Sequence, residues 1–102
     1  MAISSVELKN NYYQVFDESG KKIYETSSSF MGKLLGHGDD FIILSMDNFY
    51  ITYDERFKKI SNTNRIYVGD YKDASGSNIF FTKDNYLGIY DKNFKKIGER
   101  KV

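Results

Sequence analysis

The stretch DNFYITYDERFKKI, residues 47–60, decides the fold because the chain carries it in three copies. It returns as DNYLGIYDKNFKKI at 84–97 and, more loosely, as NNYYQVFDESGKKI at 10–23. The copies align without gaps at an offset of 37 residues. Self-similarity at one fixed spacing is the sequence signature of a repeat architecture.

The repeated box has an invariant framework. An asparagine, an aspartate, a lysine pair and an isoleucine recur at the same places, and the framework consists of Asn11, Asn48 and Asn85; Asp17, Asp54 and Asp91; Lys21, Lys58 and Lys95; Lys22, Lys59 and Lys96; and Ile23, Ile60 and Ile97. We interpret residues 1–102 as a single domain with units at about 3–39, 40–76 and 77–102, because a chain of this length fits one domain.

The apolar residues favour strands. Nine Tyr and eight Phe make the chain 17% aromatic, with no Trp. Aromatic and β-branched residues suit the half-buried surface of a pleated sheet. Each unit also divides into short runs between turn signals: in the middle unit, FIILSM at 41–46, FYITYD at 49–54, KKIS at 58–61 and RIYVGDY at 65–71. The sequence predicts an all-β antiparallel meander of about 11 short strands.

Two turns recur in each unit. Asn11, Asn48 and Asn85 each end a polar pair between β runs, which predicts a two-residue hairpin turn. Asp17, Asp54 and Asp91 begin the next turn, where their carboxylates can accept turn amides. In that turn Gly20 is replaced by Phe57 and Phe94. Because aromatic residues seldom adopt positive φ, we expect no left-handed residue there.

Two closed architectures are compatible with this pattern. The units can be propeller-like blades, or they can wrap into a small pseudo-threefold barrel. A propeller usually has about 4–8 blades, so three units are few for one chain, whereas two chains supply six.

The strand faces suggest packing and binding positions. Tyr12, Phe49 and Tyr86 occupy one place in the three units, and we expect them to lie in the core. If the units are related by rotation, equivalent lysines and tyrosines gather on one surface. The candidate binding residues are Tyr13, Tyr50, Lys22, Lys59 and Lys96.

Charge and composition exclude several classes of function. The formal net charge is +1, which is too balanced to favour nucleic acid or an anionic membrane as a partner. There is no Cys for disulfides or thiolate metal sites. No apolar run approaches the roughly 20 residues of a membrane helix, and the start MAISSVELKN lacks the pattern of a secretory signal. A cytoplasmic location is expected.

Catalytic and metal chemistry have little basis in the sequence. His37 is the only histidine, and although Asp39 and Asp40 follow it, GHGDD is typical of an exposed loop. A metal site needs three or four convergent ligands. We therefore predict no metal, no cofactor and no catalytic residue, and hence no enzyme.

Two hypotheses for the function remain. The first is a non-enzymatic binding or scaffold domain that acts through protein–protein contacts, with a protein partner or a second copy of itself, as in a homodimer. The alternative is a small lectin-like module in which the repeated aromatic side chains stack on a glycan.

Overall fold

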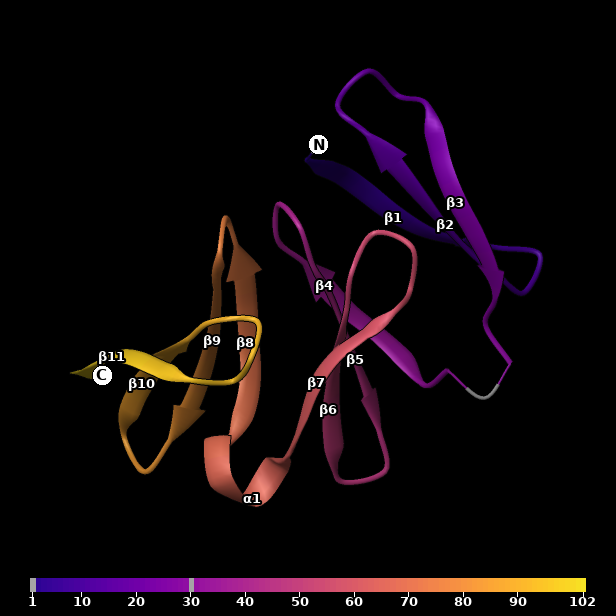
Figure 1. The fold of residues 1–102 in the computed structure, drawn as a ribbon. Helices are drawn as coiled ribbons and strands as arrows, with labels where there is room; N and C mark the ends of the chain where they lie inside the picture. The colour runs from indigo at the N-terminus through magenta and orange to yellow at the C-terminus, as the bar shows by residue number, and fades with distance from the viewer. Residues whose placement is uncertain (1, 30) are drawn as a thin grey trace.

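The computed structural model describes residues 2–29 and 31–102 and has three antiparallel sheets in a row (Figure 1). The N-terminal sheet has the order β1-β2-β3, the middle sheet β4-β5-β6-β7 and the C-terminal sheet β11-β10-β9-β8, so consecutive strands pair. The predicted all-β class and antiparallel pairing are confirmed. No sheet closes on itself in the part of the chain that the structure describes.

The element bounds are as follows: β1 Ile3–Lys9, β2 Tyr12–Asp17, β3 Lys22–Ser27, β4 Lys33–His37, β5 Ile42–Met46, β6 Phe49–Tyr53, β7 Lys59–Asn64, α1 Arg65–Val68, β8 Asp70–Ser75, β9 Asn78–Lys83, β10 Tyr86–Tyr90 and β11 Lys96–Lys101. Within the described residues, one four-residue helix interrupts the strands, and it joins the middle sheet to the C-terminal sheet (Figure 1).

Two-residue turns join β1 to β2, β5 to β6 and β9 to β10. Lys9 pairs with Tyr12, and Met46 pairs with Phe49, so only two residues separate the paired strands. Asn11 and Asn85 have φ of 68° and 69°. Asparagine tolerates this left-handed conformation, which gives Asn11 and Asn85 a backbone role. In the middle hairpin the residue with positive φ is Asp47, at 54°.

The second turn of each unit is built around an aspartate. The carboxylates of Asp17, Asp54 and Asp91 each accept the N–H groups two and four residues further on, at 2.9–3.0 Å. Each turn also contains a left-handed residue, with φ of 83° at Gly20, 57° at Phe57 and 61° at Phe94.

The expectation that this turn needs no left-handed residue was therefore wrong. A left-handed conformation costs an L-residue roughly 1–2 kcal/mol. The ring of Phe57 lies 5.9 Å from that of Tyr13 and 5.6 Å from that of Tyr53, measured between centroids. Such aromatic contacts, together with burial of the ring, offset the backbone strain.

The expectation of a strand over residues 65–71 was also wrong in part. The side chain of Asn64 accepts the N–H of Ile66 at 3.0 Å, which caps a helical turn at Arg65–Val68. Gly69, at φ 96°, ends the turn, and β8 begins at Asp70. A cap and a terminal glycine thus override the β propensity of the segment.

The core lies between the sheets in two clusters. One joins the N-terminal and middle sheets around Ile3, Tyr13, Val15, Ile42 and Leu44. The other joins the middle and C-terminal sheets around Phe41, Ile43, Tyr50, Val68, Ile79, Phe81 and Tyr90. The middle sheet is therefore covered on both faces, and each outer sheet is covered by the middle sheet on one face only.

Tyr12, Phe49 and Tyr86 do not lie in the core as expected. Their side chains are 45%, 43% and 43% exposed, whereas the neighbouring Tyr13 and Tyr50 are only 3% and 4% exposed. Both faces of these strands are partly apolar, and the neighbouring sheet covers the face that carries Tyr13 and Tyr50.

Candidate functional site

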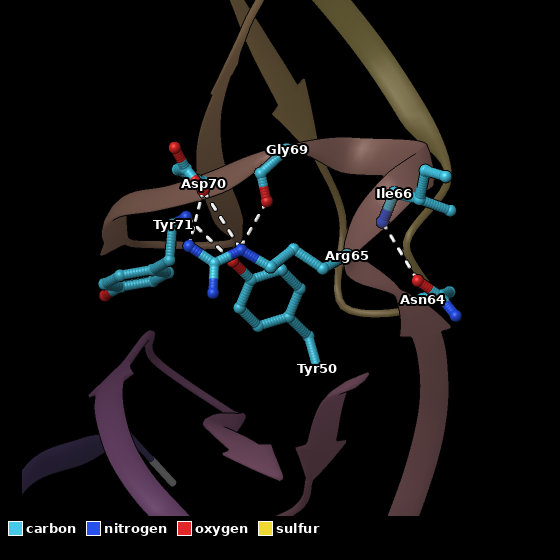
Figure 2. Close-up of polar contacts among 7 residues, drawn as sticks. All are labelled: Tyr50, Asn64, Arg65, Ile66, Gly69, Asp70 and Tyr71. Carbon is cyan, nitrogen blue, oxygen red and sulfur yellow. Dashed lines mark hydrogen bonds and ion pairs between the residues drawn. The ribbon is translucent and has the colours of Figure 1, made fainter. Parts of the chain in front are cut away.

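The short helix α1 is fixed to the sheets by its backbone (Figure 2). The N–H of Arg65 donates to the carbonyl of Asn48 at 2.7 Å, and the N–H of Gly69 closes the helical turn on the carbonyl of Arg65 at 2.8 Å. The hydroxyl of Tyr50 donates to the carbonyl of Gly69 at 2.9 Å and accepts the N–H of Tyr71 at 3.1 Å. Both ends of α1 are therefore held in place.

Two cationic side chains reinforce this attachment. The guanidinium of Arg65 donates through Nε and Nη2 to Oδ1 of Asp70, at 3.0 and 2.6 Å. This hydrogen bond raises the pKa of Arg65 above its ordinary value. The ammonium of Lys83, at the end of β9, donates to the carbonyl of Ile66 at 2.9 Å.

Only one of the three apolar side chains of α1 points inward. Val68 is 4% exposed and belongs to the core cluster between the middle and C-terminal sheets. Ile66 and Tyr67 are 69% and 73% exposed. Two large apolar groups therefore face solvent on a backbone that is held at both ends, and we call Ile66 and Tyr67 the α1 surface.

A groove of about 430 Å³ runs beside the α1 surface over β10 and β11. It is lined by Tyr67, Val68, Lys83, Asp84, Tyr86, Gly88, Tyr90, Lys96 and Glu99. Gly88 lets the ring of Tyr90 lie close to the backbone of β10, because a Cβ atom there would lie 2.7 Å from Cε1 of Tyr90. Lys96 donates to Glu99 in the groove, and this hydrogen bond raises the pKa of Lys96.

The groove can hold a ligand by stacking and hydrogen bonding. Tyr67 and Tyr86 offer exposed rings, and the Lys96–Glu99 pair offers a donor and an acceptor. Within residues 2–29 and 31–102, no three His, Asp or Glu side chains gather closely enough to hold a metal ion.

The structure places the sequence-predicted tyrosines in the interior. Tyr13 donates its hydroxyl to the carbonyl of Gly32 at 2.6 Å, as Tyr50 does to Gly69. Their rings lie in the core clusters between the sheets, so neither presents a surface for stacking. Their role in this chain is to fasten the segment that leaves each sheet.

The three predicted lysines are exposed but lie on three different sheets. Lys22 pairs with Glu25 at 3.1 Å, and Lys96 pairs with Glu99. Lys59 begins β7 at the outer edge of the middle sheet. Lys96 lines the groove beside the α1 surface, whereas Lys22 lines a separate pocket with Lys21, Glu55 and Arg56.

Sequence reasoning missed the α1 surface. The signal was present, because Asn64 precedes the segment RIYV and Gly69 follows it, which is a helix-capping pattern. The aromatic and β-branched residues between these caps favoured a strand instead.

Comparisons with protein-family models, with curated proteins and with solved structures gave no match to this chain. In the described part of the chain, no helix has the length and apolar character needed to cross a membrane.

Proposed function

We propose that the protein is a non-enzymatic binding or scaffold domain that acts through protein–protein contacts and associates with a second copy of itself. The observation that supports the contact with a partner is the α1 surface, where Ile66 and Tyr67 are largely exposed on a backbone fixed at both ends.

Exposed aromatic side chains on a rigid support are efficient binding groups. A few large residues, tyrosine prominent among them, carry most of the energy of a protein interface. Ordering a mobile loop lowers affinity, and the capped and tethered helix avoids much of that cost. The groove next to Tyr67 offers a place for a side chain of the partner.

The self-association extends the arrangement of the sheets. We take the three sheets as consecutive blades, so that they form half of a six-sheet ring and a second chain supplies the other half. The known size range of propellers, about 4–8 blades, accommodates six. In such an assembly each chain displays one α1 surface.

A glycan ligand is the alternative, favoured by the composition of the groove. Tyr67 and Tyr86 can stack on the apolar face of a sugar, while Lys96 and Glu99 can bind its hydroxyl groups. A glycan would contact Tyr86, Lys96 and Glu99, whereas a protein partner centred on the α1 surface depends on Ile66 and Tyr67.

One pair of variants separates the two functions. We would immobilise the wild-type protein and the double variant Ile66→Ser/Tyr67→Ser and use each to capture partners from a lysate of the cell that makes the protein. Each captured protein is then purified, and its affinity for the wild type and for the double variant is measured by titration. We expect a partner whose affinity for the double variant falls roughly a thousandfold, since central interface residues contribute about 2 kcal/mol or more each.

The control is Leu8→Ser/Phe49→Ser, which removes two exposed apolar groups from the N-terminal and middle sheets and should bind as the wild type does. A purified partner that binds both double variants equally would refute the α1 surface. Binding to a glycan array that is lost in Tyr86→Ser would establish the lectin function instead.

A further inference from the structure

The C-terminal sheet exposes on its outer face a position that the other two sheets bury. Ile23 in the N-terminal sheet and Ile60 in the middle sheet pack into the clusters between sheets. Ile97, 37 residues after Ile60, is 56% exposed. The outer face of the C-terminal sheet therefore has an apolar side chain at a position where the other sheets pack against a neighbour. In the part of the chain that the structure describes, no sheet covers this face.

Further apolar side chains share this outer face. Phe80 pairs with Ile89, and Leu87 pairs with Thr82. Side chains of directly paired residues lie on the same face, and so do alternate residues of one strand. Phe80, Leu87 and Ile89 therefore point to the same side. Arg100 lies opposite Leu87 on β11. A cavity of about 210 Å³ on this face is lined by Lys72, Asp73, Phe80, Leu87 and Arg100. The face is thus apolar at its centre, where Leu87 is 5% exposed, and its rim carries Lys72, Asp73 and Arg100.

The N-terminal sheet has a different outer face. The middle sheet packs against the N-terminal sheet through Ile42, Leu44, Tyr53 and Phe57. The positions 37 residues earlier are Ser5, Glu7, Phe16 and Gly20. Glu25 lies on this face beside Gln14, which donates to it at 2.8 Å. This outer face is therefore polar around a half-buried phenylalanine, and it carries Glu7 and Glu25 together with Lys9 and Lys22.

The stacking of sheets within the chain shows how the two outer faces can meet. Phe81 of the C-terminal sheet packs on Tyr50 of the middle sheet, with 4.9 Å between ring centroids. By the 37-residue offset, Glu7 of the N-terminal sheet is equivalent to Phe81, and Leu87 of the C-terminal sheet is equivalent to Tyr50. Continuing the same stacking brings Glu7 of a second chain to Leu87 and to Arg100 beside it.

We infer that the outer face of the C-terminal sheet binds the outer face of the N-terminal sheet of a second copy, with Arg100 facing Glu7 across the contact. Two other pairs of charges are bound within the chain: Lys22 binds Glu25 at 3.1 Å, and Asp70 binds Arg65 at 2.6 Å. Lys9 shares the N-terminal outer face with Glu7. Asp73 stays at the rim next to Lys72.

This inference specifies the self-association in the proposed function and rests on it. Each chain offers one face of each kind, so the contact is head-to-tail. Two such contacts related by a twofold axis close a dimer, whereas a rotation that does not close would give open chains. The α1 surface is not part of the contact, so its test above succeeds or fails independently.

Charge reversal tests the contact. We would measure the dimer dissociation constant by sedimentation for the wild type, Glu7→Arg, Arg100→Glu and an equimolar mixture of the two variants. Each variant alone places like charges in both contacts, and we expect its dissociation constant to rise roughly tenfold or more. In the mixture, both contacts of a heterodimer again join opposite charges, and the constant should return close to that of the wild type.

Folding of the variants is checked by thermal unfolding, and Lys58→Glu, in the exposed turn before β7, is the control, expected to dimerise as the wild type does. A wild-type protein that stays monomeric up to about 1 mM would overturn the inference. So would a dimer that Glu7→Arg leaves unchanged, since that result would point to a contact without the N-terminal sheet.

Discussion

The hydroxyl of Tyr50 lies 2.9 Å from the carbonyl oxygen of Gly69, and this hydrogen bond ties strand β6 to the end of α1 (Figure 2). The same hydroxyl oxygen accepts the N–H of Tyr71 at 3.1 Å. One buried phenol thus satisfies two backbone groups at the start of the C-terminal sheet.

We predict that Tyr50→Phe lowers the free energy of unfolding by about 1–3 kcal/mol, because it leaves two backbone groups without their partner. Tyr13→Phe is the matched variant. Its hydroxyl makes a hydrogen bond to Gly32 only, so its cost should be about 1 kcal/mol. Urea unfolding of both variants gives the comparison, and equal losses would contradict the double role of Tyr50.

Two adjacent tyrosines test which face of β2 is buried. Tyr12 is 45% exposed and Tyr13 is 3% exposed. We expect Tyr13→Ala to destabilise the protein by about 3–5 kcal/mol, as for other buried aromatic residues, and Tyr12→Ala by about 1 kcal/mol or less. Thermal and urea unfolding measure both changes. A larger loss for Tyr12→Ala would show that the other face of the strand is the packed one.

The turn at Gly20 isolates the cost of a left-handed backbone. Its φ is 83°, and a Cβ atom added there would meet nothing within 4 Å. Gly20→Ala should therefore destabilise by about 1 kcal/mol through backbone strain alone. Gly98→Ala is the control, since a Cβ there makes only ordinary contacts at 3.5–4.0 Å with Ile89. Its stability should stay within about 0.5 kcal/mol of the wild type.

Asp17 gives the stability a dependence on acid pH. The Ser19 hydroxyl and the Lys21 N–H donate to its carboxylate, and they lower its pKa below the usual value. A carboxyl group with a lowered folded pKa favours folding above its unfolded pKa of about 3.9, and this contribution disappears as the pH falls through the folded pKa.

We therefore expect the difference in urea midpoint between the wild type and Asp17→Asn to shrink as the pH is lowered from 7 to 2. The exposed neighbour Glu18→Gln is the control. A difference that stays constant below pH 4 would show that the Asp17 carboxylate is not held in its charged form by the turn.

Local sequence signals predicted the strands and the hairpins well. Asn11 and Asn85 stand at positions where the backbone needs positive φ, and Asp17 stands where a turn offers free amides. The positive φ of the hairpin and the acceptor for the turn amides each depend on only a few neighbouring residues. The local sequence pattern is therefore enough to predict both.

Features that depend on a second sheet were not predictable in this way. Tyr12 and Tyr13 are the same residue type, and the packing of the middle sheet alone decides which is buried. Phe57 adopts positive φ because the rings of Tyr13 and Tyr53 lie against it, and Tyr13 is distant in sequence. The α1 surface depends on Asn64 and Gly69, whose capping competes with a strong strand propensity.

The central claim is that the chain is a scaffold which assembles with itself. The most direct test of this claim is the molar mass of the wild-type protein in solution. Light scattering over a range of concentrations should approach twice the 11.9 kDa of one chain. A molar mass that remains that of a single chain up to about 1 mM would contradict it.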